Sequence, residues 1–152
     1  MNMKDERQFV GYSKYRSRLV DGHVHTELCP HGSGDRTALM IEKAIELRIE
    51  KVCLTEHAPL PAGFAAEYGG DQKAYDTASL KLNQVDTYLE LGRQLQRAYG
   101  THIDISLGFE VDYIPGFEAD IQEFLDRYGP LTDDNILSVH FMEGVNNAYY
   151  CL

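Results

Sequence analysis

The sequence of 152 residues predicts an α/β fold in which helices cover a parallel sheet. Short apolar runs of strand length alternate with longer segments whose apolar residues recur at helical spacing. The order is β-α-β-α-β-α-β, and a histidine or a glutamate stands where most of the runs end. This alternation is typical of parallel sheets, in which ligands collect at the carboxyl ends of the strands.

The first two predicted strands flank a helix. An apolar-leaning run over residues 19–24 indicates the first strand, and the periodicity over 36–49 indicates a helix that Asp35 or Thr37 would cap. The continuous apolar run over 52–54 indicates a second strand buried on both faces.

An irregular segment follows the second strand. Prolines and glycines over residues 58–78 predict a loop, and its length favours a functional role such as a substrate lid. The periodicity over 79–99 then predicts a long helix that ends at Gly100.

The last predicted elements are two strands and a helix. Strict alternation over residues 103–109 marks a strand that delivers Glu110 at its carboxyl end. A helix over 117–128 and a fourth strand over 136–141, which carries His140, complete the pattern.

The charge is distributed unevenly along the chain. Residues 1–18 carry five Lys or Arg and two Asp or Glu, and they lack the apolar stretch of a secretory signal. Since the net charge is −10, the remainder carries −13. An acidic body repels nucleic acid and membrane phosphate, but it admits a small phosphorylated substrate where dications reverse the local field. No run approaches the roughly 18 apolar residues of a membrane-spanning helix. We therefore expect neither a nucleic-acid nor a membrane partner.

The three cysteines are Cys29, Cys53 and Cys151. Their odd number and wide spacing favour a reducing compartment, hence the cytoplasm. Cys29 lies two residues before His31, where a buried thiol is the favoured interpretation and a metal ligand the alternative.

Five of the six histidines and one glutamate stand in motifs that suit a divalent metal. His23 and His25 are two residues apart, so a strand would direct both side chains to the same face. Each candidate alone could be a structural histidine or a surface carboxylate, and Glu56 is interpreted as a solvated or capping carboxylate that faces away from His57. Together they predict a multi-metal hydrolytic site. The candidate ligands are His23, His25, His31, His57, Glu110 and His140, and His102 is set aside as a surface residue.

Four motifs carry a family resemblance. They are Asp21–Gly32 (DGHVHTELCPHG), Thr55–Leu60 (TEHAPL), Gly108–Tyr113 (GFEVDY) and Leu137–Phe141 (LSVHF). In this order they resemble the motifs of the PHP (polymerase and histidinol phosphatase) superfamily, in its histidinol-phosphatase branch. The resemblance divides the chain into a polar extension over 1–18 and a PHP domain over 19–152.

The resemblance implies a distorted seven-stranded (β/α) barrel, of which this chain supplies about four βα units. It also implies a centre of up to three divalent metals, for which zinc, iron and manganese are all suitable. His23 and His25 would bind one metal, which Glu110 would bridge to a second. His140 would bind the second metal, and His31 and His57 the third. The implied reaction is hydrolysis of L-histidinol phosphate in histidine biosynthesis, by a metal-activated hydroxide.

The resemblance also implies functional residues that cannot be located in these 152 residues. Family members continue with a further histidine ligand, an Asp-x-His pair and basic residues for phosphate, and the acid for the leaving group would belong to that region. Three explanations compete. In order of preference, the chain is a fragment of a longer protein, it is a truncated and inactive product, or a second copy completes the sheet at its exposed edge. The alternatives to a phosphatase are a partial or inert metal-binding fragment and a PHP exonuclease module, which the acidic body disfavours.

Overall fold

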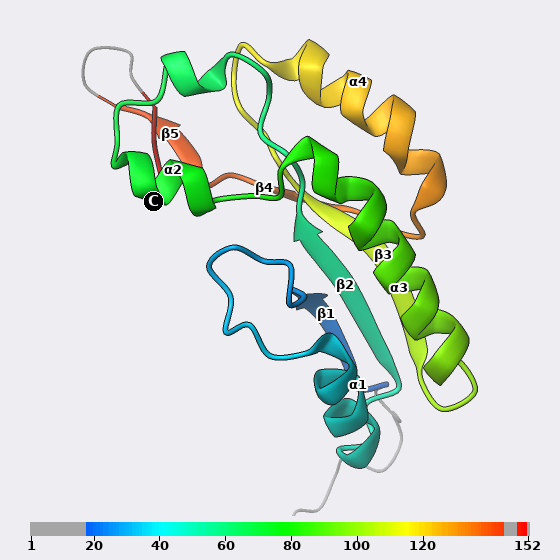
Figure 1. Cartoon of the computed structure of the whole chain (residues 1–152). Helices are drawn as coiled ribbons and strands as arrows, with labels where there is room; N and C mark the ends of the chain where they lie inside the picture. The colour runs from blue at the N-terminus through cyan, green and yellow to red at the C-terminus, as the bar shows by residue number, and fades with distance from the viewer. Residues whose placement is uncertain (1–17, 145–148, 152) are drawn as a thin grey trace, which may run out of the picture.

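A four-stranded parallel sheet forms the centre of the protein (Figure 1), as seen in a computed structural model that describes residues 18–144 and 149–151. The strands are β1 (Val20–Val24), β2 (Lys51–His57), β3 (Asp104–Asp112) and β4 (Ile136–Ser138). They lie in the order of the chain, and every neighbouring pair is parallel. The predicted α/β class with a parallel sheet is therefore confirmed.

The three longest helices lie on one face of this sheet (Figure 1): α1 (Thr37–Glu46), α3 (Val85–Tyr99) and α4 (Glu118–Tyr128). Alternation along β3 sends Leu107 and Phe109 into a core shared with these helices, where Phe109 packs on Phe124 with the ring centroids 5.1 Å apart. The same alternation turns Glu110 and Asp112 toward the opposite face. The sheet thus has an apolar side that packs and a polar side that can carry a site.

The third and fourth strands differ from their predicted bounds. β3 continues to Asp112, so Glu110 and Asp112 both belong to the strand. β4 ends at Ser138, because the backbone N–H of His140 donates to Asp112 Oδ1 at 3.1 Å rather than to a neighbouring strand. The chain then enters β5 (Phe141–Glu143), which pairs antiparallel with β6 (Tyr149–Cys151). The predicted strand over 136–141 is therefore wrong beyond Ser138.

The segment after β2 is more ordered than its sequence predicts. It contains the 3₁₀ helix η1 (Phe64–Ala66) and the helix α2 (Gln72–Thr77), which Asp71 caps by accepting a hydrogen bond from the Lys73 amide. A further 3₁₀ turn, η2 (Leu82–Gln84), delays the start of α3, so the helix predicted from residue 79 begins at Val85. Phe64 is fully buried against Phe141 and Tyr149, which fastens this segment to β5 and β6.

The cap of α1 comes from outside the helix. Neither Asp35 nor Thr37 caps it with its side chain, and Arg36 occupies the N-cap without a side-chain hydrogen bond. Instead Glu27 accepts hydrogen bonds from the backbone N–H of Thr37, at 2.7 Å, and from its hydroxyl. This contact holds the 25–36 loop, which carries Cys29 and His31, against the start of the helix.

The β4 edge of the sheet is lightly covered. β4 pairs with β3 over only three residue pairs, and Leu137 is 70% exposed. Pairing of this edge with a second copy stays a prediction. Residues 1–17 lie outside the described part of the chain, so the predicted extension over 1–18 is also untested.

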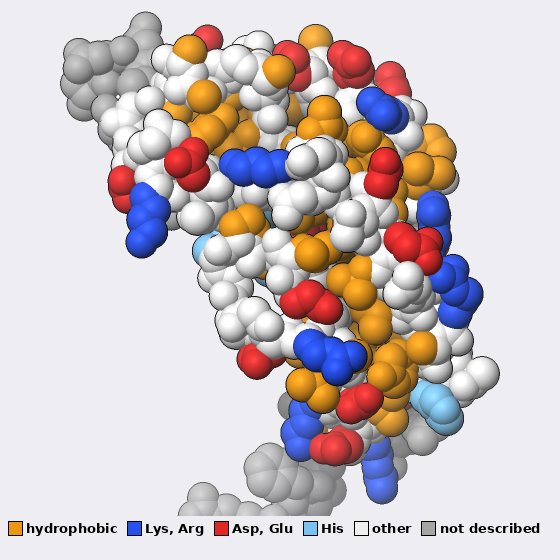
Figure 2. Space-filling model, in the orientation of Figure 1, with side chains coloured by type: hydrophobic (Ala, Val, Ile, Leu, Met, Phe, Trp, Pro, Cys, Tyr) orange, Lys and Arg blue, Asp and Glu red, His pale blue; other side chains and the backbone are white. Residues whose placement is uncertain are grey.

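None of the helices in the described ranges is long and apolar enough to cross a membrane. On the face shown in Figure 2, Lys and Arg side chains are interspersed with Asp, Glu and hydrophobic side chains. That face therefore does not present the continuous basic groove that a nucleic-acid backbone requires.

Candidate metal centre

The six predicted ligands come together at the carboxyl ends of the strands. His23 lies in β1 and His25 just beyond it, His57 ends β2, Glu110 lies near the end of β3, and His140 follows β4. His31 reaches the same place from the loop between β1 and α1. His102 lies exposed before β3, at the opposite end of the sheet, as predicted.

Glu110 stands at the centre of this cluster. Its side chain is 3% exposed, and four imidazoles surround it. Oε2 lies 2.9 Å from His23 Nε2, 3.4 Å from His25 Nε2 and 3.2 Å from His57 Nδ1. Oε1 lies 3.3 Å from His140 Nε2. A buried carboxylate between several imidazoles is a mixed O and N donor set that suits borderline divalent ions.

Three of the histidines are oriented from outside the cluster. His25 Nδ1 lies 3.1 Å from Glu56 Oε1, and His140 Nδ1 lies 2.9 Å from Asp112 Oδ1. His31 Nδ1 lies 2.7 Å from the Thr77 carbonyl at the end of α2. Because carbonyl and carboxylate oxygens only accept, each Nδ1 must donate. Each Nε2 is then the nitrogen available to a metal.

The Nε2 atoms of His23 and His25 lie so close together that their lone pairs would repel each other if nothing lay between them. These atoms lie 3.1 Å apart, so a proton or a metal ion must lie between them. Two nitrogens bound to one tetrahedral zinc are separated by about 3.3 Å, since each Zn–N bond is about 2.0–2.1 Å. The hydrogen bond that His25 donates to the Glu56 carboxylate raises the pKa of His25. Both observations show that a cation is favoured at these nitrogens.

His57 is the most deeply buried histidine of the cluster. It is 7% exposed, and its Nδ1 makes no hydrogen bond within the described part of the chain. Its ring stacks on His25 at 4.4 Å and lies 5.0 Å from His31 and 5.3 Å from His140. Burial lowers the pKa of His57 to about 4, so the ring is neutral near pH 7 and has a free lone pair for a metal.

A sequence profile of the PHP domain matches residues 21–151. The chain belongs to the PHP family. This confirms the family resemblance of the four motifs. The fold agrees, because 87% of this chain superposes on 48% of the crystal structure of HisK from Listeria monocytogenes, a candidate histidinol phosphatase, with a TM-score of 0.84 and 41% identity.

Two curated relatives of the PHP domain carry related names. The histidinol-phosphatase of Bacillus subtilis is 42% identical over 132 residues, which are 87% of this chain and 47% of the relative. A probable histidinol-phosphatase of Deinococcus radiodurans is 28% identical over 82% of this chain and 43% of the relative. The chain therefore spans about half the length of the curated relatives it matches.

A second crystal structure shares the fold. Histidinol phosphate phosphatase from Lactococcus lactis, solved with zinc, L-histidinol and phosphate, superposes on 82% of this chain and 41% of its own, with a TM-score of 0.62 and 24% identity. At that identity the match shows the PHP fold alone.

The sequence did not identify two carboxylates at the cluster, Glu56 and Asp112, as site residues. Glu56 is fully buried, where it also accepts hydrogen bonds from the backbone N–H and hydroxyl of Thr26 at 2.9 and 2.7 Å. Burial opposes its ionisation, but the hydrogen bonds from His25 and Thr26 outweigh burial and hold the pKa of Glu56 below its usual value. The prediction of a solvated or capping carboxylate is therefore wrong. Asp112 could have been found, because it lies two residues beyond Glu110 on the same face of one strand.

The thiol of Cys29 also reaches the cluster. Cys29 is 6% exposed, and burial raises the pKa of its thiol. The predicted burial of the thiol is confirmed.

Three groups have donor atoms within 4.8 Å of one another: His23, His25 and Glu110; His57, Asp112 and His140; and His25, Cys29 and His57. The donor types, the unsatisfied Nδ1 of His57 and the converging Nε2 atoms together fit divalent metals.

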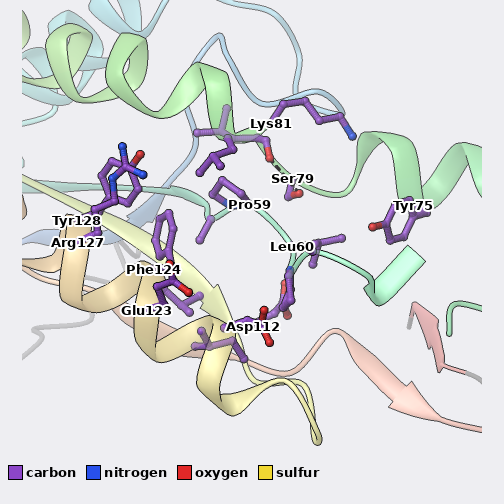
Figure 3. A pocket seen from close by; sticks show the side chains of 18 residues that line it. Pro59, Leu60, Tyr75, Ser79, Lys81, Asp112, Glu123, Phe124, Arg127 and Tyr128 are labelled. Atoms are coloured by element: carbon purple, nitrogen blue, oxygen red, sulfur yellow. Dashed lines mark hydrogen bonds between the residues drawn. The ribbon is translucent and has the colours of Figure 1, made fainter. Parts of the chain in front are cut away.

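A cavity of about 330 Å³ lies between α4, the end of β3 and the segment over residues 58–82 (Figure 3). Phe124 and Tyr128 form part of its wall, and Asp112 is the residue it shares with the cluster. None of the six predicted ligands lines it. The Glu110 cluster is open to solvent on a different side from this cavity, because the side chains of His23 and His140 are 47% and 38% exposed.

Proposed function

We propose that the PHP domain binds divalent metals at the Glu110 cluster and hydrolyses a phosphate monoester there, with L-histidinol phosphate as substrate. The observation that carries this proposal is the buried Glu110 carboxylate, which lies within 3.4 Å of nitrogens from four imidazoles. Such an arrangement is costly without cations between its members, since it concentrates lone pairs and a buried charge.

Each residue has a separate task in this assignment. His23 and His25 would hold one ion, and Glu110 would bridge it to a second ion held by His140. His31 and His57 would hold a third. The short approach of the His23 and His25 nitrogens supports the first pair, and the 5.0 Å separation of the His31 and His57 rings supports the last.

The ligands are held in place before any ion arrives. Glu56 and Asp112 fix the rings of His25 and His140, and the Thr77 carbonyl fixes His31. Such outer hydrogen bonds set both the tautomer and the direction of the ring. The segment after β2, expected to act as a lid over the substrate, therefore also positions a ligand through Thr77.

Charge explains why the site needs metals to accept a phosphate. Glu56, Glu110 and Asp112 are three buried acidic residues in or against the cluster, and His57 is neutral near pH 7. Without bound metal ions, this acidic surface repels a phosphoryl group. Dications held by the histidines and Glu110 would reverse the local field, and they would supply a hydroxide near neutral pH and charge neutralisation for the phosphoryl oxygens. The exposed sides of His23 and His140 leave an approach for the substrate.

The choice of substrate rests on the relatives. The Bacillus subtilis protein is a histidinol-phosphatase, and the Lactococcus lactis protein was solved with zinc, L-histidinol and phosphate. Imidazole and carboxylate donors suit zinc, iron and manganese alike. A second candidate function is a metal-binding domain without turnover, which is favoured by the lightly covered β4 edge.

One experiment separates these functions. The purified chain is loaded with zinc or manganese, the bound metal is counted, and phosphate release from L-histidinol phosphate is measured, with single-stranded DNA as the control substrate. Metal together with phosphate release supports the phosphatase, and metal without release supports the metal-binding domain without turnover. Absence of tightly bound metal in the wild type, or equal metal content in His23→Ala and the surface control His102→Ala, contradicts the assignment.

A further inference from the structure

Cys29 lies in the loop between β1 and α1, at the wall of the Glu110 cluster. Its sulfur and one ring nitrogen each from His25 and His57 all lie within 4.8 Å of one another. At 6% exposure the sulfur is shielded from solvent, and it stands with two of the residues assigned to metals.

The loop keeps the sulfur in this position. The backbone N–H of Cys29 donates to the Thr26 carbonyl at 3.0 Å, and the Gly32 N–H donates to the Cys29 carbonyl at 3.1 Å. A Cβ at residue 32 would lie 3.2 Å from Cys29 Cβ and 3.6 Å from Sγ, so the turn closes tightly against the cysteine. The local backbone therefore helps to hold the sulfur in this position.

An independent observation points to a missing ligand beside the sulfur. His57 is more than nine-tenths buried, and its Nδ1 makes no hydrogen bond within the described ranges, although Glu110 Oε2 lies 3.2 Å away. A buried ring nitrogen without a hydrogen bond is costly, because it has lost its hydrogen bond to water. His25 stacks on the same ring, and one nitrogen of each of these two rings lies within 4.8 Å of the Cys29 sulfur.

We propose that Cys29 is a ligand of the third ion, beside His31 and His57, so that the centre has one thiolate position. The inference rests on the proposed metal-binding function and specifies the chemistry of one of its ions. Binding forms a sulfur–metal bond in place of the S–H bond, and the released proton goes to solvent. Two imidazoles and a thiolate suit tetrahedral zinc or cobalt, whereas manganese and magnesium prefer oxygen. Cys29 thus makes this position selective for the softer ions.

Cobalt(II) tests the proposal without any assay of activity. Bound cobalt gives visible d–d bands whatever its ligands, and a thiolate ligand adds a charge-transfer band in the near ultraviolet. The metal-free wild-type chain, Cys29→Ser and Cys29→Ala are titrated with Co²⁺. The matched controls are Cys53→Ser and Cys151→Ser. Cys53 is 8% exposed in β2, belongs to none of the three donor groups, and has Lys51 as its leading charged neighbour.

We expect the charge-transfer band in the wild type and in both control variants. The two Cys29 variants should lose it and keep the d–d bands. Their preference for zinc over manganese should fall by about 10–100-fold, the range that loss of an outer hydrogen-bond partner alone can reach.

Two results would overturn the assignment of Cys29: d–d bands without charge transfer in the wild type, or a charge-transfer band that survives in Cys29→Ala. Absence of every cobalt band in the wild type would reject the metal centre itself, and with it the proposed function. The two failures are therefore distinguishable.

Discussion

His57 and Glu110 are partners in the parallel register of β2 and β3, and Glu110 Oε2 lies 3.2 Å from His57 Nδ1. Two adjacent strands therefore present a base and an acid at the same height on the polar face of the sheet. Both residues are buried. Because strand register rather than a loop fixes this pair, the centre of the cluster has little freedom to rearrange when ligands bind.

The charge of Glu110 should be needed for metal binding. Glu110→Gln keeps the size of the side chain but removes the negative charge that faces the four imidazoles. We expect the affinity for zinc to fall by at least about 10–100-fold, measured by competition with a chelator. Glu46→Gln, in an exposed pair with Lys43, should bind zinc like the wild type. Equal affinities in the two variants would reject Glu110 as a ligand.

The sequence predicted the central parts of this fold because they are local patterns. The alternation that precedes Glu110 and the apolar run that precedes His57 are both visible in single segments, and a strand formed at each, although β3 continues to Asp112. The motifs also identified the six residues that meet at the strand ends. Their meeting needed only the rule that parallel strands share one carboxyl edge.

What the sequence missed depends on contacts between distant segments. Glu56 is fully buried, and its partner His25 lies 31 residues earlier. The end of β4 is decided by Asp112, which takes the amide of His140. The cap of α1 comes from Glu27, ten residues before Thr37. No local propensity encodes such pairings, because the competing local choices are equally good for the isolated segment.

Glu56 should act as a positioning residue for His25. Glu56→Gln keeps an oxygen that can accept from His25 Nδ1, whereas Glu56→Ala removes the acceptor and leaves the Thr26 groups unpaired. We expect Glu56→Ala to weaken zinc binding by about 10–100-fold and to lower the free energy of unfolding by about 1–3 kcal/mol.

Partial rescue by Glu56→Gln separates positioning from a purely structural role. Calorimetry of zinc binding should place this variant between the wild type and Glu56→Ala. If both variants lose stability but bind zinc with wild-type affinity, Glu56 supports the fold and not the ligand.

Gly108 should be intolerant of any side chain. A Cβ at this position would lie 1.5 Å from the Asp134 carbonyl oxygen, so the backbone that leads into β4 would have to move. We expect Gly108→Ala to lower the free energy of unfolding by about 1–3 kcal/mol in urea titrations. Gly129→Ala is the matched control, since a Cβ there has no heavy atom within 4 Å. A Gly108→Ala protein as stable as this control would show that the 133–135 turn adapts.

The metal-free protein should lose stability in acid because of His57. Burial holds the pKa of His57 near 4, whereas in the unfolded chain it lies near 6.5. Between these values the unfolded state binds a proton that the folded state does not, so the free energy of unfolding falls as the pH falls from about 6.5 to 4. The lowered pKa of Glu56 adds to the loss below about 4.5, since its stabilisation is present above that pH and disappears in acid. The raised pKa of His25 acts in the opposite direction, because its contribution is present below about 6.5 and is lost as the pH rises.

Replacement of His57 isolates its share of this acid sensitivity. Urea unfolding of the metal-free chain, measured from pH 7 to pH 4, should show a shallower dependence on pH in His57→Gln than in the wild type. The difference should approach about 3 kcal/mol over the interval, since each unit of pKa shift corresponds to about 1.4 kcal/mol. His102→Gln changes an exposed histidine at the other end of the sheet and should follow the wild type. Parallel curves for the wild type and His57→Gln would mean that the buried ring is protonated as readily in the folded protein as in the unfolded chain.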